Sequence, residues 1–178
     1  CIFGGDLCYI VHPSDTAPML AALGAVCRVD GDGSSRSVAV EALHMPPSED
    51  PRRETVLEVG EIITEIVVPA PAPGSRSSYR KARTRQAWDF ALAGVALAFV
   101  FDGETVASAR IFLSGVAPVP WRSASAEAAV IGTTLDDAAI AAAAEAAVAG
   151  AEPLAENGYK VELVKGLMAE QLEAMRAQ

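Results

Sequence analysis

Cysteine and histidine are scarce in this chain of 178 residues, which has only three cysteines and two histidines. So few thiols cannot form a disulfide framework; they indicate a reducing compartment, and the cytoplasm is the expected location. Cys1 and Cys8 could supply two ligands of an iron–sulfur cluster but not four, and we expect Cys8 to be buried and unreactive. His12 and His44 have no evident acidic partner in the sequence, so a nucleophilic triad is not indicated.

Long apolar runs and the common catalytic motifs are also absent. The longest apolar stretches, residues 90–101 and 138–149, are shorter than the ~20 residues that cross a bilayer, so no membrane span is predicted. The chain has no GxSxG, HExxH, GxxxxGKS/T or CxxC motif, so hydrolase, zinc-protease, P-loop and thiol-redox chemistry are not indicated. Fourteen basic residues against 23 acidic ones give a net charge of −9, which disfavours nucleic acid as a partner.

The most informative segment present is CIFGGDLCYIVHPSDTAPMLAALG, residues 1–24, which joins a diglycine turn to a helix start. Gly4 and Gly5 let backbone N–H groups approach a ligand closely, because no Cβ intervenes. Ser14 and Asp15 place a hydroxyl and a carboxylate at the positive end of the following helix. This arrangement suits a diphosphate or polyol ligand, although a tight turn before an ordinary capped helix would have the same composition.

Pro18 affects what Asp15 can do. A proline in the first helical turn has no N–H, so fewer backbone donors remain for Asp15 to cap. We therefore expect its carboxylate to be free for ligand hydroxyls. The chain opens directly on this turn without an initiator Met or a signal peptide, and we expect it to be the back part of a longer protein.

Periodicity and turn residues predict two α+β units, 1–70 and 71–178, separated at the stiff segment PAPAPG. The elements expected in the first unit are a short helix at 14–24, a hairpin of strands 25–29 and 37–40 around the turn 30–33, and a strand at 61–68. Those expected in the second are strands at 78–85, 90–101 and 105–114, then helices at 125–131, at 136–149 and after an Asn157 cap.

A cluster of positive charge follows the predicted boundary. Its members are Arg76, Arg80, Lys81, Arg83 and Arg85. Because side chains alternate between the two faces of a strand, about half of these residues are expected to lie on a solvated face. The functional alternatives are a cation beside an anionic or electron-rich cofactor, or a docking edge for a partner subunit.

Together these segments resemble the C-terminal part of the FAD-binding medium subunit of the molybdenum hydroxylases, the xanthine dehydrogenase and carbon monoxide dehydrogenase family. The similar pieces, in order over nearly the whole chain, are IFGG with CYIVHPSDTAPMLAALGA, GEIITEIVVP, SYRKARTR, ARIFLSGVAPVPWR, AEAAVIG and PLAENGYKVELVKGLM. The resemblance implies an α+β fold. Residues 1–70 would be the second lobe of a vanillyl-alcohol-oxidase-type FAD domain, and residues 71–178 a small C-terminal domain of antiparallel strands packed with helices.

The resemblance also implies a set of cofactor-binding residues, and it implies neither a catalytic side chain nor a metal ligand. Arg80 is the alternative to Lys81, because some relatives place the basic residue directly after the aromatic one. The residues so implied are Gly4, Gly5 and Asp6 along the FAD, Ser14 and Asp15 at its ribityl or diphosphate part, and Ile63 and Lys81 at the flavin ring.

The function implied by the resemblance is electron relay. A large subunit would hydroxylate substrate at a molybdenum cofactor, a small subunit with two-iron clusters would carry the electrons, and FAD would pass them to NAD or another acceptor. The protein would position and tune the flavin. The alternative is an interaction module that braces the flavin lobe, docks the other subunits and holds no FAD by itself.

Overall fold

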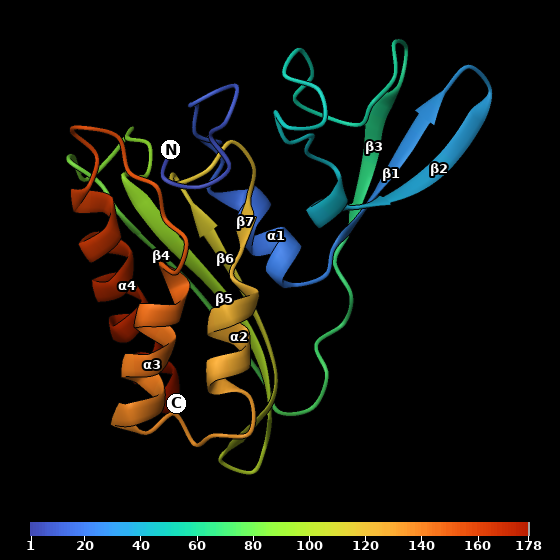
Figure 1. Ribbon diagram of the computed structural model, residues 1–178. Coiled ribbons are helices and arrows are strands. Elements are labelled where there is room, and N and C mark those ends of the chain that lie inside the picture. Colours follow the sequence, from blue (N-terminus) through green and yellow to red (C-terminus); the bar gives the residue numbers. More distant parts are fainter. Residues whose placement is uncertain (178) are drawn as a thin grey trace.

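The computed structural model describes residues 1–177 and arranges them around two antiparallel sheets (Figure 1). The three-stranded sheet has the order β2-β1-β3, and the four-stranded sheet has the order β4-β5-β6-β7. The strands are β1 (Val26–Gly31), β2 (Ser34–Ala39), β3 (Ile62–Val67), β4 (Ser75–Ala82), β5 (Ala93–Asp102), β6 (Thr105–Ser114) and β7 (Trp121–Arg122). The helices are α1 (Thr16–Ala22), α2 (Ala124–Val130), α3 (Asp137–Ala147) and α4 (Tyr159–Arg176), with a short 3-10 turn η1 (Val40–Ala42).

The β1–β2 hairpin forms where a DG pair permits a tight turn. Asp32 and Gly33 have φ values of +44° and +77°, the left-handed conformations that a two-residue hairpin loop of this twist requires. β1 is the central strand of its sheet, and Cys27 and Val29 on it are buried, whereas β3 is exposed along its whole length.

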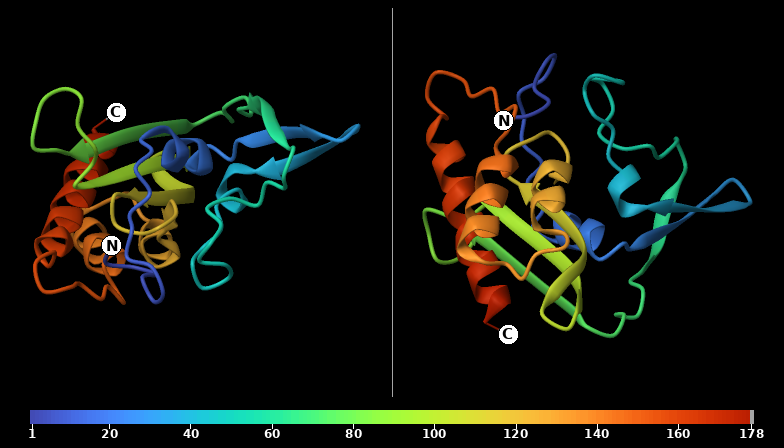
Figure 2. Two further views of the ribbon diagram at one scale, coloured as in Figure 1. Left: turned by 90° about the horizontal axis from the view of Figure 1, so that it is seen from above. Right: turned by 60° about the horizontal axis from the view of Figure 1, so that its bottom comes forward.

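Within the four-stranded sheet, β5 is buried on both faces along most of its length. α2, α3 and α4 cover one face, and α1 lies against the other (Figure 2). Val95, Leu97 and Phe99 of β5 belong to the core under the three helices. Ala96 of the same strand and Phe112 of β6 belong instead to the core formed with α1 and β1. The period of two in residues 90–101 therefore separates two cores instead of a core from solvent.

Most predicted elements are present near their expected positions, and three local predictions are wrong. β4 ends at Ala82 instead of Arg85, because the Asp89 carboxylate accepts the N–H groups of Thr84 and Arg85. Asn157 does not cap α4, whose N-cap is Gly158. Cys8 is only partly buried, whereas Cys1 and Cys27 are buried. No helix among residues 1–177 is long and apolar enough to cross a membrane.

Candidate functional site

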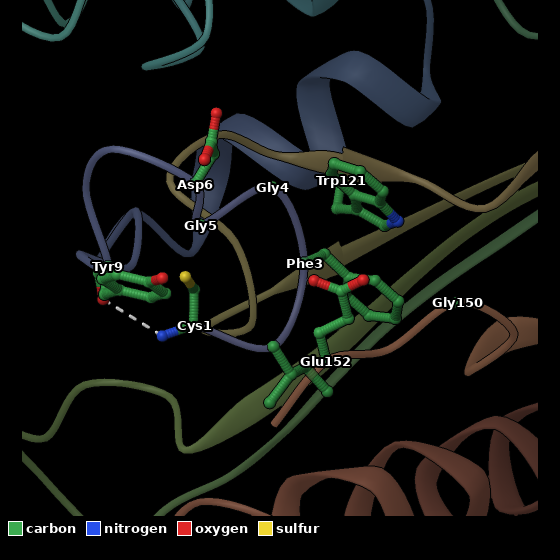
Figure 3. Close-up of a pocket in the computed structure, with 10 residues that line it drawn as sticks. Cys1, Phe3, Gly4, Gly5, Asp6, Tyr9, Trp121, Gly150 and Glu152 are labelled. Carbon is green, nitrogen blue, oxygen red and sulfur yellow. Dashed lines mark hydrogen bonds between the residues drawn. The ribbon is translucent and has the colours of Figure 1, made fainter. Parts of the chain in front are cut away.

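The diglycine turn lines a pocket of about 380 Å³, shown in Figure 3. Three residues predicted from the sequence to bind the cofactor, Gly4, Gly5 and Asp6, lie together on its wall. Three further lining residues, Trp121, Gly150 and Glu152, come from more than a hundred positions later in the chain. The rest of the lining is Cys1, Ile2, Phe3 and Tyr9.

The turn requires glycine at both positions. Gly4 has a φ of +61°, and a Cβ there would lie 3.2 Å from Cζ3 of Trp121. A Cβ on Gly5 would lie 2.6 Å from the sulfur of Cys1 and 2.8 Å from Cδ1 of Tyr9. Larger side chains would therefore collide with their neighbours or strain the backbone.

The N–H groups of this turn are available to an anion. Within residues 1–177, the N–H groups of Gly4, Gly5 and Asp6 form no hydrogen bond, and Gly4 and Asp6 are exposed. Successive free N–H groups in a glycine turn bind phosphate oxygens well. The Asp6 carboxylate is unsuited to phosphate but can accept from a hydroxyl.

A second cluster forms around Asp15. Its Oδ1 accepts a 2.9 Å hydrogen bond from the Tyr79 hydroxyl, and its Oδ2 pairs with Nζ of Lys81. Lys81 also donates to the backbone oxygen of Asp89 at 2.9 Å. Its side chain is 16% exposed and that of Asp15 is 40% exposed. α1 and β4 therefore bring together two residues that the sequence predicted to bind the cofactor, Asp15 and Lys81.

One part of the prediction for Asp15 is confirmed. Asp15 makes no side-chain cap, as expected. Ser14 makes the cap instead, because its Oγ accepts the N–H of Ala17 at 3.0 Å. Each oxygen of the Asp15 carboxylate already has one protein partner, Tyr79 or Lys81, so a ligand hydroxyl would bind through the remaining lone pairs. Burial raises the pKa of Tyr79 to about 12, and the Asp15 carboxylate contributes to the rise, so the phenol remains a donor.

The segment Ser114–Ala117 connects the two clusters. Ser114 Oγ lies 3.2 Å from the Tyr79 hydroxyl. Two residues later, the Val116 carbonyl accepts the N–H groups of Ile2 at 2.7 Å and Phe3 at 3.1 Å. Ile2 and Phe3 directly precede the diglycine turn. One turn of chain at the end of β6 therefore fixes both the Asp15 cluster and the base of the pocket.

The structure does not bring Ile63 and Arg80 into these clusters. Ile63 lies on β3, where it pairs with Val29, and it is not among the residues that line the pocket. Arg80 pairs with Glu170 of α4 at 3.1 Å. Neighbours on a strand point to opposite faces, so Lys81, and not Arg80, lies against Asp15.

Sequence reasoning missed an aromatic loop beside Lys81. The side chains of Trp88 and Phe90 are 96% and 73% exposed, whereas the loop backbone between β4 and β5 is held by Asp89 through Thr84 and Arg85. Trp88 has a φ of +54°, uncommon for a bulky side chain. The tripeptide Trp-Asp-Phe in a chain with only 6% aromatic residues was the available signal.

Among the residues that the structure describes, no group of three or more His, Cys, Asp or Glu side chains is placed to hold a metal ion. Cys1, Cys8 and Cys27 are all free.

Comparison with known proteins gives two families in succession. Residues 2–71 match the FAD binding domain in molybdopterin dehydrogenase, and residues 77–175 match the CO dehydrogenase flavoprotein C-terminal domain. The aldehyde oxidoreductase FAD-binding subunit PaoB of Escherichia coli (strain K12) is 36% identical over 174 residues, which are 97% of this chain and 51% of that subunit. The carbon monoxide dehydrogenase medium chain of Hydrogenophaga pseudoflava is 34% identical over 84% of this chain and 50% of its own length.

A solved structure agrees with these sequence matches. Carbon monoxide dehydrogenase from Hydrogenophaga pseudoflava, in a form lacking the Mo-pyranopterin moiety of its cofactor, superposes with a TM-score of 0.80 and 30% identity, over 92% of this chain and 57% of that one. The chain spans about half the length of the curated relatives it matches. Matched over most of its residues and in its fold, the chain belongs to the CO dehydrogenase flavoprotein family and corresponds to the C-terminal part of its FAD-binding medium subunits.

Proposed function

We propose that this chain is the C-terminal part of the FAD-binding medium subunit of a molybdenum hydroxylase, an oxidoreductase subunit that relays electrons. The observation that carries the proposal is that one segment, Ser114–Ala117, holds both clusters. It binds Ile2 and Phe3 before the unbonded N–H groups of the diglycine turn, and it binds Tyr79 beside the Asp15–Lys81 pair. The first group of atoms suits a diphosphate, and the second offers a carboxylate for hydroxyls and a cation for an electron-rich ring.

The proposed roles of the single residues follow from their chemistry. The N–H groups of Gly4 and Gly5 would bind the diphosphate, and the carboxylate of Asp6 would accept from a ribose or ribityl hydroxyl. Ser14 would hold α1 so that Asp15 faces the cofactor. Bound FAD would supply the electron transfer itself.

Two further side chains are proposed to tune the flavin. The ammonium of Lys81 would place positive charge beside a ring that gains electrons, while its bonds to Asp15 and to the Asp89 carbonyl orient it. Ile63, 39% exposed on β3, would offer an apolar surface to the ring. No side chain of this chain is required to act as an acid or a base.

The names of the relatives, an aldehyde oxidoreductase FAD-binding subunit and a carbon monoxide dehydrogenase medium chain, support a multi-subunit assembly. We propose a large subunit with a molybdenum cofactor and a small subunit with two-iron clusters as partners, NAD or another acceptor at the flavin, and a cytoplasmic location. A xanthine dehydrogenase-like substrate is a third possibility beside aldehyde and CO. Within the chain, we propose residues 1–70 as the flavin lobe and residues 71–178 as the second domain.

Flavin titration tests this function. The full-length subunit that contains this chain is expected to retain one FAD, with flavin absorbance that survives desalting. This chain by itself is expected to be colourless and to give no spectral shift with FAD, because the resemblance implies that most diphosphate contacts belong to the first lobe of such domains. A full-length subunit that is also colourless would contradict the proposal and favour the interaction module.

A further inference from the structure

The three residues before the diglycine turn are held by the C-terminal part of the chain. Cys1, Ile2 and Phe3 are 7%, 1% and 4% exposed, whereas Gly4 is exposed. The chain therefore leaves the interior at the first glycine. The contacts that hold Cys1, Ile2 and Phe3 therefore limit the conformations that the turn can adopt.

Trp121 forms the floor beneath the turn. Its ring, which lies beside Gly4 in Figure 3, stacks on Phe3 with centroids 5.0 Å apart and an interplanar angle of 11°. Its Cζ3 would lie 3.2 Å from a Cβ at position 4. The main chain of Trp121 is held because β7 pairs it with Leu113 of β6, and the stack on Phe3 holds the ring. A fixed aromatic surface restricts the φ and ψ values open to Gly4.

Asn157 holds the other end of the segment. Its Nδ2 donates to the Cys1 carbonyl at 2.9 Å, and its Oδ1 accepts the N–H of Leu154 at 2.6 Å. A donor and an acceptor facing the two amide atoms fix the orientation of the amide. The neighbouring N–H of Glu152 donates to the Ile2 carbonyl at 2.8 Å, so the loop before α4 contacts residues 1 and 2 directly.

We propose that Trp121 and Asn157 are positioning residues that preorganise the diglycine turn for its ligand. This inference rests on the proposed FAD site and adds residues outside the matched FAD domain to it. A loop held in its bound conformation loses less entropy on binding, so the contacts of a distant domain become part of the affinity. The prediction of Asn157 as a helix cap misread a residue whose side chain is committed to Cys1.

Two variants separate positioning from ordinary packing. Asn157→Asp retains the acceptor for Leu154 but removes the donor to Cys1. Trp121→Leu removes the aromatic floor, and Trp121→Phe restores a ring. Phe101→Leu is the matched control, because Phe101 is a buried aromatic of the same core, 8% exposed, that lines no part of the pocket.

The first measurement needs no cofactor. Amide hydrogen exchange of Ile2, Phe3 and His12, all bonded to Val116 or Ala117, is followed by NMR in this chain. Exchange is expected to be at least tenfold faster in Asn157→Asp and Trp121→Leu than in Phe101→Leu, once each rate is corrected for its change in thermal stability. Trp121→Phe is expected to return it toward the parent value. Equal exchange in all variants would overturn the inference.

The second measurement uses the full-length subunit and FAD. Asn157→Asp and Trp121→Leu are expected to raise the Kd for FAD about tenfold, with Phe101→Leu within twofold of the parent. An unchanged Kd in the first two, or an equal rise in the control, would overturn the inference. Failure of the parent subunit to bind FAD would instead contradict the proposed function, while the exchange result would still report on the positioning.

Discussion

The hydroxyl of Tyr79 donates a 2.9 Å hydrogen bond to the carboxylate of Asp15, which lies 64 residues earlier. This contact joins α1 to β4, and Lys81 on the same strand binds the other carboxylate oxygen. A carboxylate with two partners from one strand cannot turn away without leaving the mostly buried Lys81 ammonium with a single carbonyl acceptor. The pair therefore holds the orientation of the first helix relative to the four-stranded sheet.

Asp15→Asn is expected to weaken FAD retention in the full-length subunit. The amide can still accept from Tyr79, but its loss of charge leaves Lys81 without an anion and removes the carboxylate proposed for cofactor hydroxyls. An affinity loss of about tenfold, which corresponds to about 1.4 kcal/mol, would be measured by isothermal titration. The pKa of Tyr79 is expected to fall in the same variant, because the Asp15 charge helps to raise it; ultraviolet titration of the phenol would follow that change.

His44→Ala is the control for this experiment. Its ring lies against His12 and lines no part of the diglycine pocket. FAD retention is expected to be unaffected, and equal losses in both variants would mean that the site has been misplaced.

The carboxylate of Glu127 gives a stability prediction. It is 6% exposed, accepts the N–H of Ile111 at 3.0 Å and pairs with Arg122 at 3.0 Å. Glu127→Ala leaves a buried N–H without an acceptor and is expected to lower the free energy of unfolding by about 3 kcal/mol. Glu127→Gln can still accept from Ile111 and is expected to cost about half as much. Urea denaturation would measure both.

The matched control is Glu145→Ala. Its side chain is 70% exposed and forms only a surface pair with Lys165, so a change within about 0.5 kcal/mol is expected. A similar loss for Glu145→Ala and Glu127→Ala would show that burial of the carboxylate does not determine its contribution.

Local pattern predicted those elements whose residues decide their own conformation. The strand 105–114 is found at the predicted residues as β6, and the DG turn is found in the predicted hairpin. Pattern failed where a distant contact decided the outcome. The two residues of β7 are too few to produce a period, and they form a strand only because Phe112 and Leu113 offer partners.

The candidate site shows the same division. Gly4, Gly5 and Asp6 share a pocket, and Asp15 and Lys81 form a pair. The resemblance implied all five for one common site, which stays a prediction. Tyr79, Trp121 and Asn157 were not predicted to be part of it, because only the fold brings them to residues 1–15. Their local sequences indicate only a strand for Tyr79, a loop for Trp121 and a helix cap for Asn157.

Stability is expected to fall as the pH drops from about 6.5 to about 4, in part because of two histidines. The rings of His12 and His44 lie 4.3 Å apart, and burial, followed by repulsion from His12, lowers the pKa of His44 to about 4. Burial also lowers the pKa of His12, partly opposed by Glu54. Because these pKa values are below the unfolded value near 6.5, the unfolded state takes up more protons in this window.

His44→Gln isolates this contribution. Acidic residues also titrate at low pH, so the quantity to compare is the slope of the melting temperature against pH between about 4 and 6.5 in the variant and the parent. The variant is expected to have the shallower slope. A slope equal to that of the parent would exclude the histidine pair as a source of the acid sensitivity.

Gly115→Ala is expected to lower the free energy of unfolding more than Gly132→Ala, although both replace a glycine of positive φ. Gly115 has a φ of +70°, and a Cβ there would lie 2.7 Å from the backbone oxygen of Ala91. Gly132 has a φ of +82° with no atom within 4 Å of its Cβ position. Gly132→Ala therefore reports only the cost of a left-handed conformation, about 1 kcal/mol.

Gly115→Ala adds a collision that only backbone movement can relieve, and we expect a loss of about 3 kcal/mol or more in urea denaturation. The movement would displace the Val116 carbonyl, which holds Ile2 and Phe3. Faster amide exchange at these two residues is therefore expected in Gly115→Ala and not in Gly132→Ala. Equal destabilisation in the two variants, with no difference in exchange, would show that the end of β6 does not fix the base of the diglycine turn.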